Sequence, residues 1–191
     1  MGAVGNRRGE DLPVGKGECY NYRIDLGKEN MALEKPLEVL VGEYLRRRGL
    51  RLAVAESCTG GLIGHRLTNV AGSSTYYMGS VIAYAYEAKV RLLGVRWETL
   101  ERYGAVSKET VLEMAYGVRQ ALAADVGISV SGIAGPGGGT PDKPVGLTWI
   151  GLSASGVDEA WSYIWGGDRI QVKEQTAEQA LRLLAEFLAD G

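Results

Sequence analysis

Short apolar runs typical of buried strands alternate with segments of helical periodicity along most of this chain. The runs RLAVAE (51–56), SVIAYAY (80–86) and VGISVSGI (126–133) are predicted strands. Two more runs, VGLTWIGLSA and EAWSYIWG, flank Gly156 and predict a hairpin. Because a parallel strand needs a crossover before it, usually a helix, this alternation predicts an α/β fold: a mixed, mostly parallel sheet with helices on both faces.

The predicted helices have recognisable beginnings and ends. The first follows Pro36 and ends at Gly49, and the second begins at Gly60 or Gly61. Four more cover residues 87–93, 97–103, 108–124 and 171–188. Ser107 is placed to cap the helix that follows it through its hydroxyl. The first three strands are therefore joined by crossovers, as parallel strands require.

The first thirty residues differ from the rest of the chain. They show neither a two-residue nor a 3.6-residue apolar period, which predicts an extension without packed structure. Met31 begins MALEKPLEVLVGEYL, an ordinary start for a domain, and Lys28-Glu29 before it can be encoded as AAGGAG, a ribosome-binding sequence. We therefore expect residues 1–31 to be a disordered or mis-annotated extension, with translation starting at Met31, and residues 32–191 to form one domain.

Charge and cysteine content exclude several classes of protein. The chain has 21 Lys and Arg against 23 Asp and Glu residues, a net charge of -2, so it offers no broad cationic surface for nucleic acid or an anionic membrane. Cys19, Cys58 and one histidine are too few for a disulfide framework or a structural zinc site. No apolar run reaches the roughly 20 residues of a membrane span, and the N-terminus lacks the apolar region of a secretory signal. We expect a cytoplasmic protein that uses no metal and no cofactor.

The stretch AESCTGG combines polar side chains with glycines where a predicted strand ends. Ligands of open α/β sheets bind beyond the carboxyl ends of the strands, and the glycine-rich loop 132–139 follows another strand to the same edge. Ser57 at such a corner is often only a helix cap. The glycines, however, let a substrate approach the backbone and expose N–H groups at Cys58, Thr59 and Gly60 that suit an oxyanion or a phosphate. The stretch therefore predicts a binding or catalytic site.

Ser57 and Cys58 compete for the role of nucleophile, because neighbouring side chains point in different directions. Cysteine is the better intrinsic nucleophile, but its thiolate usually has a histidine partner. His65, the single histidine, lies about 12 Å beyond Ser57 along a helix and is predicted to be a surface residue. A lysine is then the remaining base for an activated serine. Lys89 in YAYEAKV lies one turn into a helix near the same sheet edge, a position that also suits a solvated helix lysine.

Five motifs occur in an order that resembles one known family. ESCTGG, YAYEAK, YGAVS, SGIAGPGGGTPDKPVG and GDR lie within a match from about Leu37 to Leu188 and are similar to motifs of the CinA C-terminal domain family, the bacterial nicotinamide mononucleotide deamidases. The resemblance implies a three-layer α/β/α sandwich with a mixed five-stranded sheet. It also implies hydrolysis of the carboxamide of nicotinamide mononucleotide to nicotinate mononucleotide and ammonia by a Ser-Lys dyad, and a homodimer.

The match of motifs assigns roles to residues of this chain. The nucleophile falls on Ser57, the base on Lys89, and two supporting roles on Tyr84 and Arg169. The substrate-binding residues implied by the two glycine-rich loops are Cys58, Thr59, Gly60, Gly61, Gly132, Ile133, Ala134, Gly135, Pro136 and Gly137. Tyr86 departs from the family pattern, which commonly has Asn at this position, so the resemblance leaves substrate selectivity open.

Each implied role has a chemical requirement. Lys89 can deprotonate Ser57 only when neutral, so its pKa must lie below the ~10.4 of a free lysine, and burial or a nearby cation such as Arg169 lowers it. The Tyr84 hydroxyl can orient the amine or relay a proton to the leaving ammonia, or its ring can simply pack over the core.

Two other functions are alternatives to the deamidase that the resemblance implies. One is a nucleotide-binding regulatory module without turnover. The other is an amidase for a different amide, with a pocket that Tyr86 reshapes.

Overall fold

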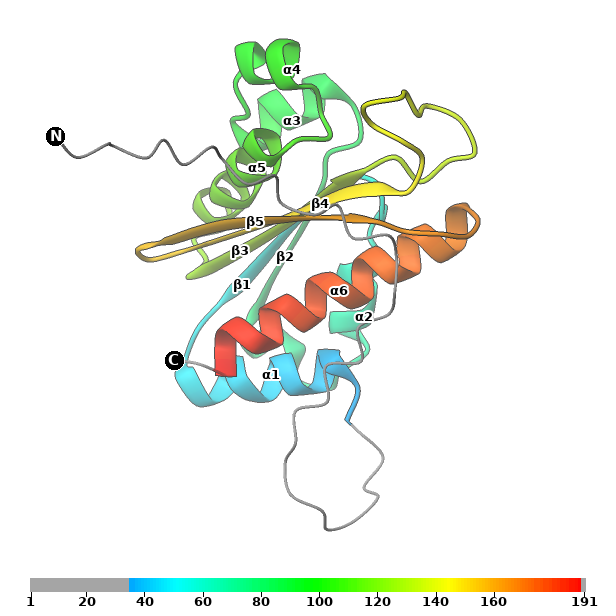
Figure 1. The fold of residues 1–191 in the computed structure, drawn as a ribbon. Helices are drawn as coiled ribbons and strands as arrows, with labels where there is room; N and C mark the ends of the chain where they lie inside the picture. Colours follow the sequence, from blue (N-terminus) through cyan, green and yellow to red (C-terminus); the bar gives the residue numbers. More distant parts are fainter. Residues whose placement is uncertain (1–34, 190–191) are drawn as a thin grey trace, which may run out of the picture.

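A five-stranded sheet forms the middle layer of the structure, a computed structural model that describes residues 35–189 (Figure 1). The strands are β1 (Leu52–Glu56), β2 (Tyr77–Ile82), β3 (Val126–Gly132), β4 (Leu147–Ala154) and β5 (Val157–Ile164). Their order is β2-β1-β3-β4-β5, with β1 parallel to β2 and β3, and β4 antiparallel to β3 and β5. Among these five strands β4 alone runs against the others, which confirms the mixed, mostly parallel sheet.

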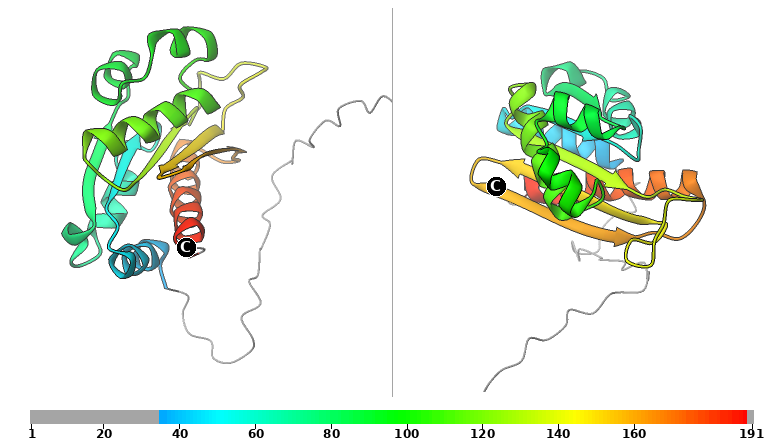
Figure 2. Two further views of the ribbon diagram at one scale, coloured as in Figure 1. Left: turned by 90° about the vertical axis from the view of Figure 1, so that its left-hand side faces the viewer. Right: turned by 90° about the horizontal axis from the view of Figure 1, so that it is seen from above.

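Helices cover both faces of this sheet and confirm the three-layer sandwich (Figures 1 and 2). The helices on one face are α1 (Leu37–Arg48), α2 (Leu62–Thr68) and α6 (Arg169–Ala189). Those on the other face are α3 (Tyr86–Leu93), α4 (Trp97–Tyr103) and α5 (Lys108–Ala121). A short 3-10 helix, η1 (Ser73–Thr75), precedes β2. Each apolar helix face is therefore buried against the sheet or against a neighbouring helix.

The central strands are apolar because both of their faces are buried. All five residues of β1 are buried, and their side chains alternate between two cores. Leu52 and Val54 pack with residues of α1, α2 and α6, whereas Ala53 and Ala55 pack with residues of α3, α4 and α5. Ser57 continues the alternation of Ala53 and Ala55, so it faces the side of the sheet that carries α3 and α5.

Local signals in the sequence end α1 and begin α5 as predicted. Gly49 ends α1 in a left-handed conformation with φ of 64°, which glycine adopts without a steric penalty. The Ser107 hydroxyl accepts a hydrogen bond from the Thr110 N–H at 3.2 Å and so caps the start of α5. These two helix ends are determined by residues within one turn of them.

The second strand differs from its predicted position at 80–86. The observed β2 begins at Tyr77, and its register pairs Ile82 with Glu56, the last residue of β1. Because β2 is an edge strand of the described sheet, it loses its hydrogen-bonding partner once β1 ends. The chain then leaves the sheet, and Tyr86 begins α3 one residue before the predicted start.

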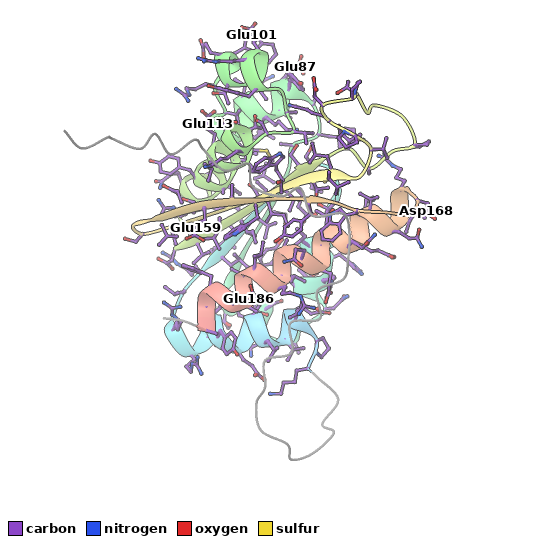
Figure 3. All side chains as sticks on the ribbon, in the orientation of Figure 1. Glu87, Glu101, Glu113, Glu159, Asp168 and Glu186 are labelled. Atoms are coloured by element: carbon purple, nitrogen blue, oxygen red, sulfur yellow. The ribbon has the colours of Figure 1, made fainter. Side chains whose placement is uncertain are left out.

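Two helix ends also differ from the prediction. The sixth helix begins at Arg169, two residues before its predicted start, because Asp168 Oδ1 accepts from two N–H groups of the first turn and caps it. Figure 3 labels Asp168 at this end of α6. The fifth helix ends at Ala121, three residues before its predicted end, because Ala123 adopts a positive φ of 48° that interrupts helical geometry.

The prediction for residues 1–31 lies outside the described residues. Within residues 35–189, none of the helices combines the length and the apolar composition needed to cross a membrane. The same residues contain no group of three or more His, Cys, Asp or Glu side chains arranged to hold a metal ion.

Candidate active site

The predicted nucleophile lies where the parallel strands β1 and β3 end. Glu56 of β1 pairs with Val130 of β3, and the Ser57 N–H extends this pairing by donating to the Val130 carbonyl at 3.1 Å. Ser57 and Ser131 are consequently neighbours on adjacent strands and share one face of the sheet. This is the face that carries α3, from which Lys89 reaches Ser57.

Lys89 contacts the Ser57 hydroxyl in the interior of the protein. The lysine side chain is fully buried, and its Nζ lies 2.9 Å from Ser57 Oγ. Nζ also donates to the carbonyl oxygens of Ala83, at 2.7 Å, and Tyr84, at 3.3 Å. Carbonyl oxygens only accept hydrogen bonds, so a neutral amine directs its two N–H groups to them. The lone pair of neutral Lys89 then faces Ser57 Oγ, as a general base requires.

Burial moves the pKa values of two neighbouring groups in opposite directions. It lowers the pKa of Lys89 to about 8, because the buried ammonium loses its hydration. It raises the pKa of the Cys58 thiol to about 12, because a buried thiolate also loses its hydration. The site therefore contains a lysine that can act as a base and a thiol that stays protonated, which favours Ser57 as the nucleophile. His65, exposed on α2, lies outside the site, as predicted.

Arg169 joins three segments at the edge of the site. Its Nη2 donates to the Tyr84 hydroxyl at 3.0 Å, and its Nη1 donates to the Gly135 carbonyl at 2.8 Å. Tyr84 belongs to the loop between β2 and α3, Gly135 to the loop after β3, and Arg169 begins α6. Tyr84 is 63% exposed, so the Tyr84–Arg169 pair lies where the site opens to solvent.

A cavity of about 160 Å³ connects these residues. Its lining includes predicted site residues from both glycine-rich loops and from the implied catalytic set, namely Ser57, Cys58, Tyr84, Lys89, Gly132, Ala134 and Arg169. It also includes three residues to which the sequence assigned no role, namely Ala105, Val106 and Ser131. The predicted binding residues outside the lining are Thr59, Gly60, Gly61, Ile133, Gly135, Pro136 and Gly137. The structure therefore brings the four implied catalytic residues to one cavity and leaves part of the glycine-rich loops around it.

Comparison with known protein families covers nearly all of the described chain. The family model described as the CinA C-terminal domain matches residues 34–188. This chain belongs to the CinA C-terminal domain family. The match includes every residue of the cavity lining, and it confirms the family resemblance of the motifs.

Relatives of this CinA domain are longer proteins. A CinA-like protein of Kosmotoga olearia is 49% identical over 155 residues, which make up 81% of this chain but 38% of that protein. A CinA-like protein of Salinibacter ruber is 52% identical over 145 residues, 76% of this chain and 35% of that protein. The chain thus spans little more than a third of the length of these curated relatives.

Solved structures of similar length share the fold of this CinA domain. A CinA superfamily protein of Klebsiella pneumoniae 700603 superposes with a TM-score of 0.78 at 37% identity, over 81% of this chain and 97% of that one. A competence/damage inducible protein of Agrobacterium tumefaciens has a TM-score of 0.76 at 38% identity, over 82% of this chain and 98% of that one. Both comparisons confirm the α/β sandwich with its mixed five-stranded sheet.

A buried carboxylate holds the loop that follows β1 in this CinA domain, at a position to which the sequence assigned no role. Glu56 immediately precedes Ser57 and is fully buried. Its carboxylate accepts five hydrogen bonds, from the hydroxyls of Thr59 and Ser80 and from the N–H groups of Gly61, Ile63 and Gly64. It thereby accepts hydrogen bonds from N–H groups at the start of α2 that have no partner within the helix. It also places negative charge at the positive end of that helix. In the sequence, the signal for this role of Glu56 was a single acidic residue at the end of an otherwise apolar strand.

The contacts of Glu56 limit which loop groups can bind a ligand in this CinA domain. The Gly61 N–H and the Thr59 hydroxyl both donate to the carboxylate, at 2.8 Å and 2.7 Å. The N–H groups of Cys58 and Thr59 donate to no oxygen atom within residues 35–189. The Gly60 N–H also donates to no oxygen atom there, so all three amides predicted for an oxyanion remain available, and those of Cys58 and Thr59 lie directly after Ser57.

Tyr86 contacts the wall of the cavity rather than its interior. The Tyr86 hydroxyl accepts from the Ala105 N–H at 3.2 Å, and its ring meets the Trp97 ring edge-on. Lys143 donates to the carbonyl of neighbouring Val106 at 2.8 Å. Two long side chains thus hold the loop between α4 and α5 that closes one wall. Ala105 and Val106 belong to the motif YGAVS. The family resemblance therefore included this wall of the cavity but assigned no role to its residues.

Proposed function

We propose that this CinA domain hydrolyses the carboxamide of nicotinamide mononucleotide, giving nicotinate mononucleotide and ammonia. The observation that carries the proposal is the buried Lys89 amine, 2.9 Å from the Ser57 hydroxyl and lining a small cavity with it. Its lowered pKa supplies the neutral base that an amide hydrolase of the serine-lysine type needs. Family membership supports the same reaction class.

In the first step, Ser57 attacks the carboxamide carbon. The neutral Lys89 amine removes the hydroxyl proton while Ser57 Oγ forms a bond to that carbon. The carbonyl electron pair moves to oxygen, and the N–H groups of Cys58 and Thr59 hold the resulting oxyanion. Loss of one such donor typically costs about 2.7–4 kcal/mol of transition-state stabilisation.

In the second step, the tetrahedral intermediate collapses. The C–N bond breaks, and the departing nitrogen takes the proton that Lys89 received from Ser57, which releases ammonia and leaves an ester on Ser57. Neutral Lys89 then removes a proton from a water molecule as the water oxygen attacks the ester. The ester C–O bond breaks, Ser57 Oγ regains a proton from Lys89, and the product leaves as a carboxylic acid that releases its proton to solvent and becomes the carboxylate. One water molecule is consumed and every proton is accounted for.

The cavity suits the carboxamide-bearing ring rather than the whole nucleotide. Its volume of about 160 Å³ is below the roughly 300–1,000 Å³ of typical small-molecule pockets. In this proposal the ring lies beside Ser57, and the ribose phosphate extends through the opening near Arg169. Lys173, one turn further along α6, has its Nζ 3.8 Å from the point where a Cβ on Gly60 would stand. Arg169 and Lys173 supply positive charge for the phosphate there.

Ammonia release from three substrates tests the proposal. The purified chain is expected to release ammonia from nicotinamide mononucleotide and much less from nicotinamide, which lacks the phosphate, or from NAD, which is larger. Ser57→Ala serves as the inactive control. Binding of nicotinamide mononucleotide without ammonia release would favour a regulatory nucleotide-binding module. Faster ammonia release from another amide would contradict the proposed substrate. The cavity wall that Tyr86 contacts would then be the first place to look for the cause.

A further inference from the structure

Ser131 is a polar residue of the cavity that the mechanism above does not use. It is 1% exposed, lies near the end of β3 and lines the cavity. The parallel register that pairs Glu56 with Val130 places Ser131 beside Ser57, on the same face of the sheet. Its hydroxyl therefore belongs to the same small space as the nucleophile.

The Ser131 hydroxyl differs from that of its neighbour Ser129. Ser129 also lies on β3 and on the same face, and its hydroxyl donates to the Val111 carbonyl at 2.6 Å, away from the cavity. By contrast, no hydrogen bond joins Ser131 Oγ to another atom of residues 35–189. Buried hydroxyls are normally paired, so an unpaired one that lines a cavity indicates a partner supplied by the ligand.

The other side chains of the cavity restrict which part of a carboxamide Ser131 meets. A primary carboxamide has an oxygen that accepts and two N–H groups that donate. Arg169 and the protonated form of Lys89 are donors only, and the Tyr84 side chain is mostly exposed, with its hydroxyl held by Arg169 where the site opens to solvent. Apart from the nucleophile, Ser131 is therefore the lining side chain best placed to accept from a substrate N–H.

We propose that Ser131 is a further catalytic residue, whose hydroxyl oxygen accepts a hydrogen bond from the N–H of the scissile carboxamide. This inference rests on the proposed function, because it needs a carboxamide beside Ser57. The hydrogen bond orients the amide nitrogen so that its lone pair, as it forms in the tetrahedral intermediate, can take the proton from Lys89. It therefore helps an amide more than an ester, since an ester has no N–H to donate.

The test compares an amide with an ester in Ser131→Ala. The substrates are nicotinamide mononucleotide and the methyl ester of nicotinate mononucleotide, which undergo the same attack by Ser57. We expect kcat/KM for the amide to fall about tenfold in Ser131→Ala, the loss of one neutral hydrogen bond, and kcat/KM for the ester to change by less than about twofold. Ser131→Thr keeps the hydroxyl and is expected to restore most of the amide activity.

Ser129→Ala is the matched control, because it removes a buried hydroxyl from the same strand outside the cavity. It is expected to lower the melting temperature but to leave the amide-to-ester ratio at the wild-type value. Equal losses on amide and ester in Ser131→Ala, or no loss on either, would overturn the role of Ser131 while leaving the proposed function intact. Wild-type protein that hydrolyses the ester but not the amide, or neither substrate, would overturn both.

Discussion

Burial changes the chemistry of two neighbouring side chains, Cys58 and Lys89, through one physical cause. A low-dielectric environment disfavours whichever form of a group is charged. For Lys89, with a pKa of about 8, this makes the neutral amine the main form above that pH, and for Cys58, with a pKa of about 12, it keeps the thiol protonated. The hydroxyl of Ser57, which is weak by itself, is then the group that a neighbouring base can activate.

Substitution of the two rival nucleophiles tests this assignment. Ser57→Ala removes the attacking oxygen and should lower kcat for ammonia release by at least about 1,000-fold, whereas Cys58→Ala should keep most of it. Ammonia release and the melting temperature of each variant are the measurements, and an unchanged melting temperature of Ser57→Ala excludes unfolding as the cause. Loss of activity in Cys58→Ala alone would assign the chemistry to the thiol.

The pH dependence of the reaction tests the base. Because Lys89 must be neutral to accept the Ser57 proton, kcat/KM should rise with pH through a group with a pKa of about 8 and level off above it. Lys89→Met should lack measurable turnover at every pH but still bind the nucleotide. A profile that is flat from pH 6 to pH 9, or a Lys89→Met variant with normal turnover, would remove Lys89 from the mechanism.

At the scale of elements, α6 contributes to the site through where it begins. The Asp168 cap starts the helix at Arg169, so this guanidinium reaches Tyr84 and Gly135. One turn later, Lys173 lies beside Gly60. A single helix end therefore places one cation in the cavity lining and a second beside the loop that follows β1.

Removal of the positive charge of Lys173 tests whether this residue binds the phosphate of the substrate. Lys173→Gln should raise KM for nicotinamide mononucleotide about tenfold, with little change in kcat, because the lost interaction is equal in ground and transition states. For the riboside, which lacks the phosphate, KM should not change. Lys108→Gln removes the same charge from the exposed start of α5 and is the control. A change in KM of equal size for both substrates would contradict phosphate binding.

The contact between α5 and the sheet depends on a glycine. A Cβ added to Gly127 of β3 would overlap the carbonyl oxygen of Ala115 in α5. Gly127→Ala should therefore lower the free energy of unfolding by about 1–3 kcal/mol, because α5 must move away from β3. Urea denaturation measures the change, and Gly166→Ala, which meets no atom within 4 Å, is the control. Equal stability of the two variants would show that the layers are more loosely packed than the structure indicates.

At the scale of the whole molecule, the buried Lys89 couples the site to folding stability. Its pKa is about 8 in the folded protein but ~10.4 in an unfolded chain, so between these values the unfolded state binds more protons. The free energy of unfolding should therefore rise with pH across this window because of Lys89. Denaturation of wild type and Lys89→Met from pH 7 to pH 10.5 should show the rise as a difference between the two proteins. Parallel curves would contradict the lowered pKa.

The sequence by itself determined the features that depend on residues close together in the chain. Apolar runs and helical periodicity predicted the strands and helices, and Gly49 and Ser107 marked helix ends correctly. The five motifs of the family resemblance contained the residues that meet at the cavity. Their order and their resemblance to motifs of the CinA C-terminal domain family were enough to recognise them.

Only the tertiary structure decided the features that depend on contacts between distant segments. The end of β2 follows from where its partner β1 ends. Ser131 joins Ser57 through the register of two strands separated by about 70 residues of sequence, and Glu56 acts through donors that the fold of α2 turns toward it. Periodicity indicates which face of a strand is buried, but not which neighbour that face meets. Hydrogen bonds and cavity walls form between such neighbours, so they are properties of the packed molecule.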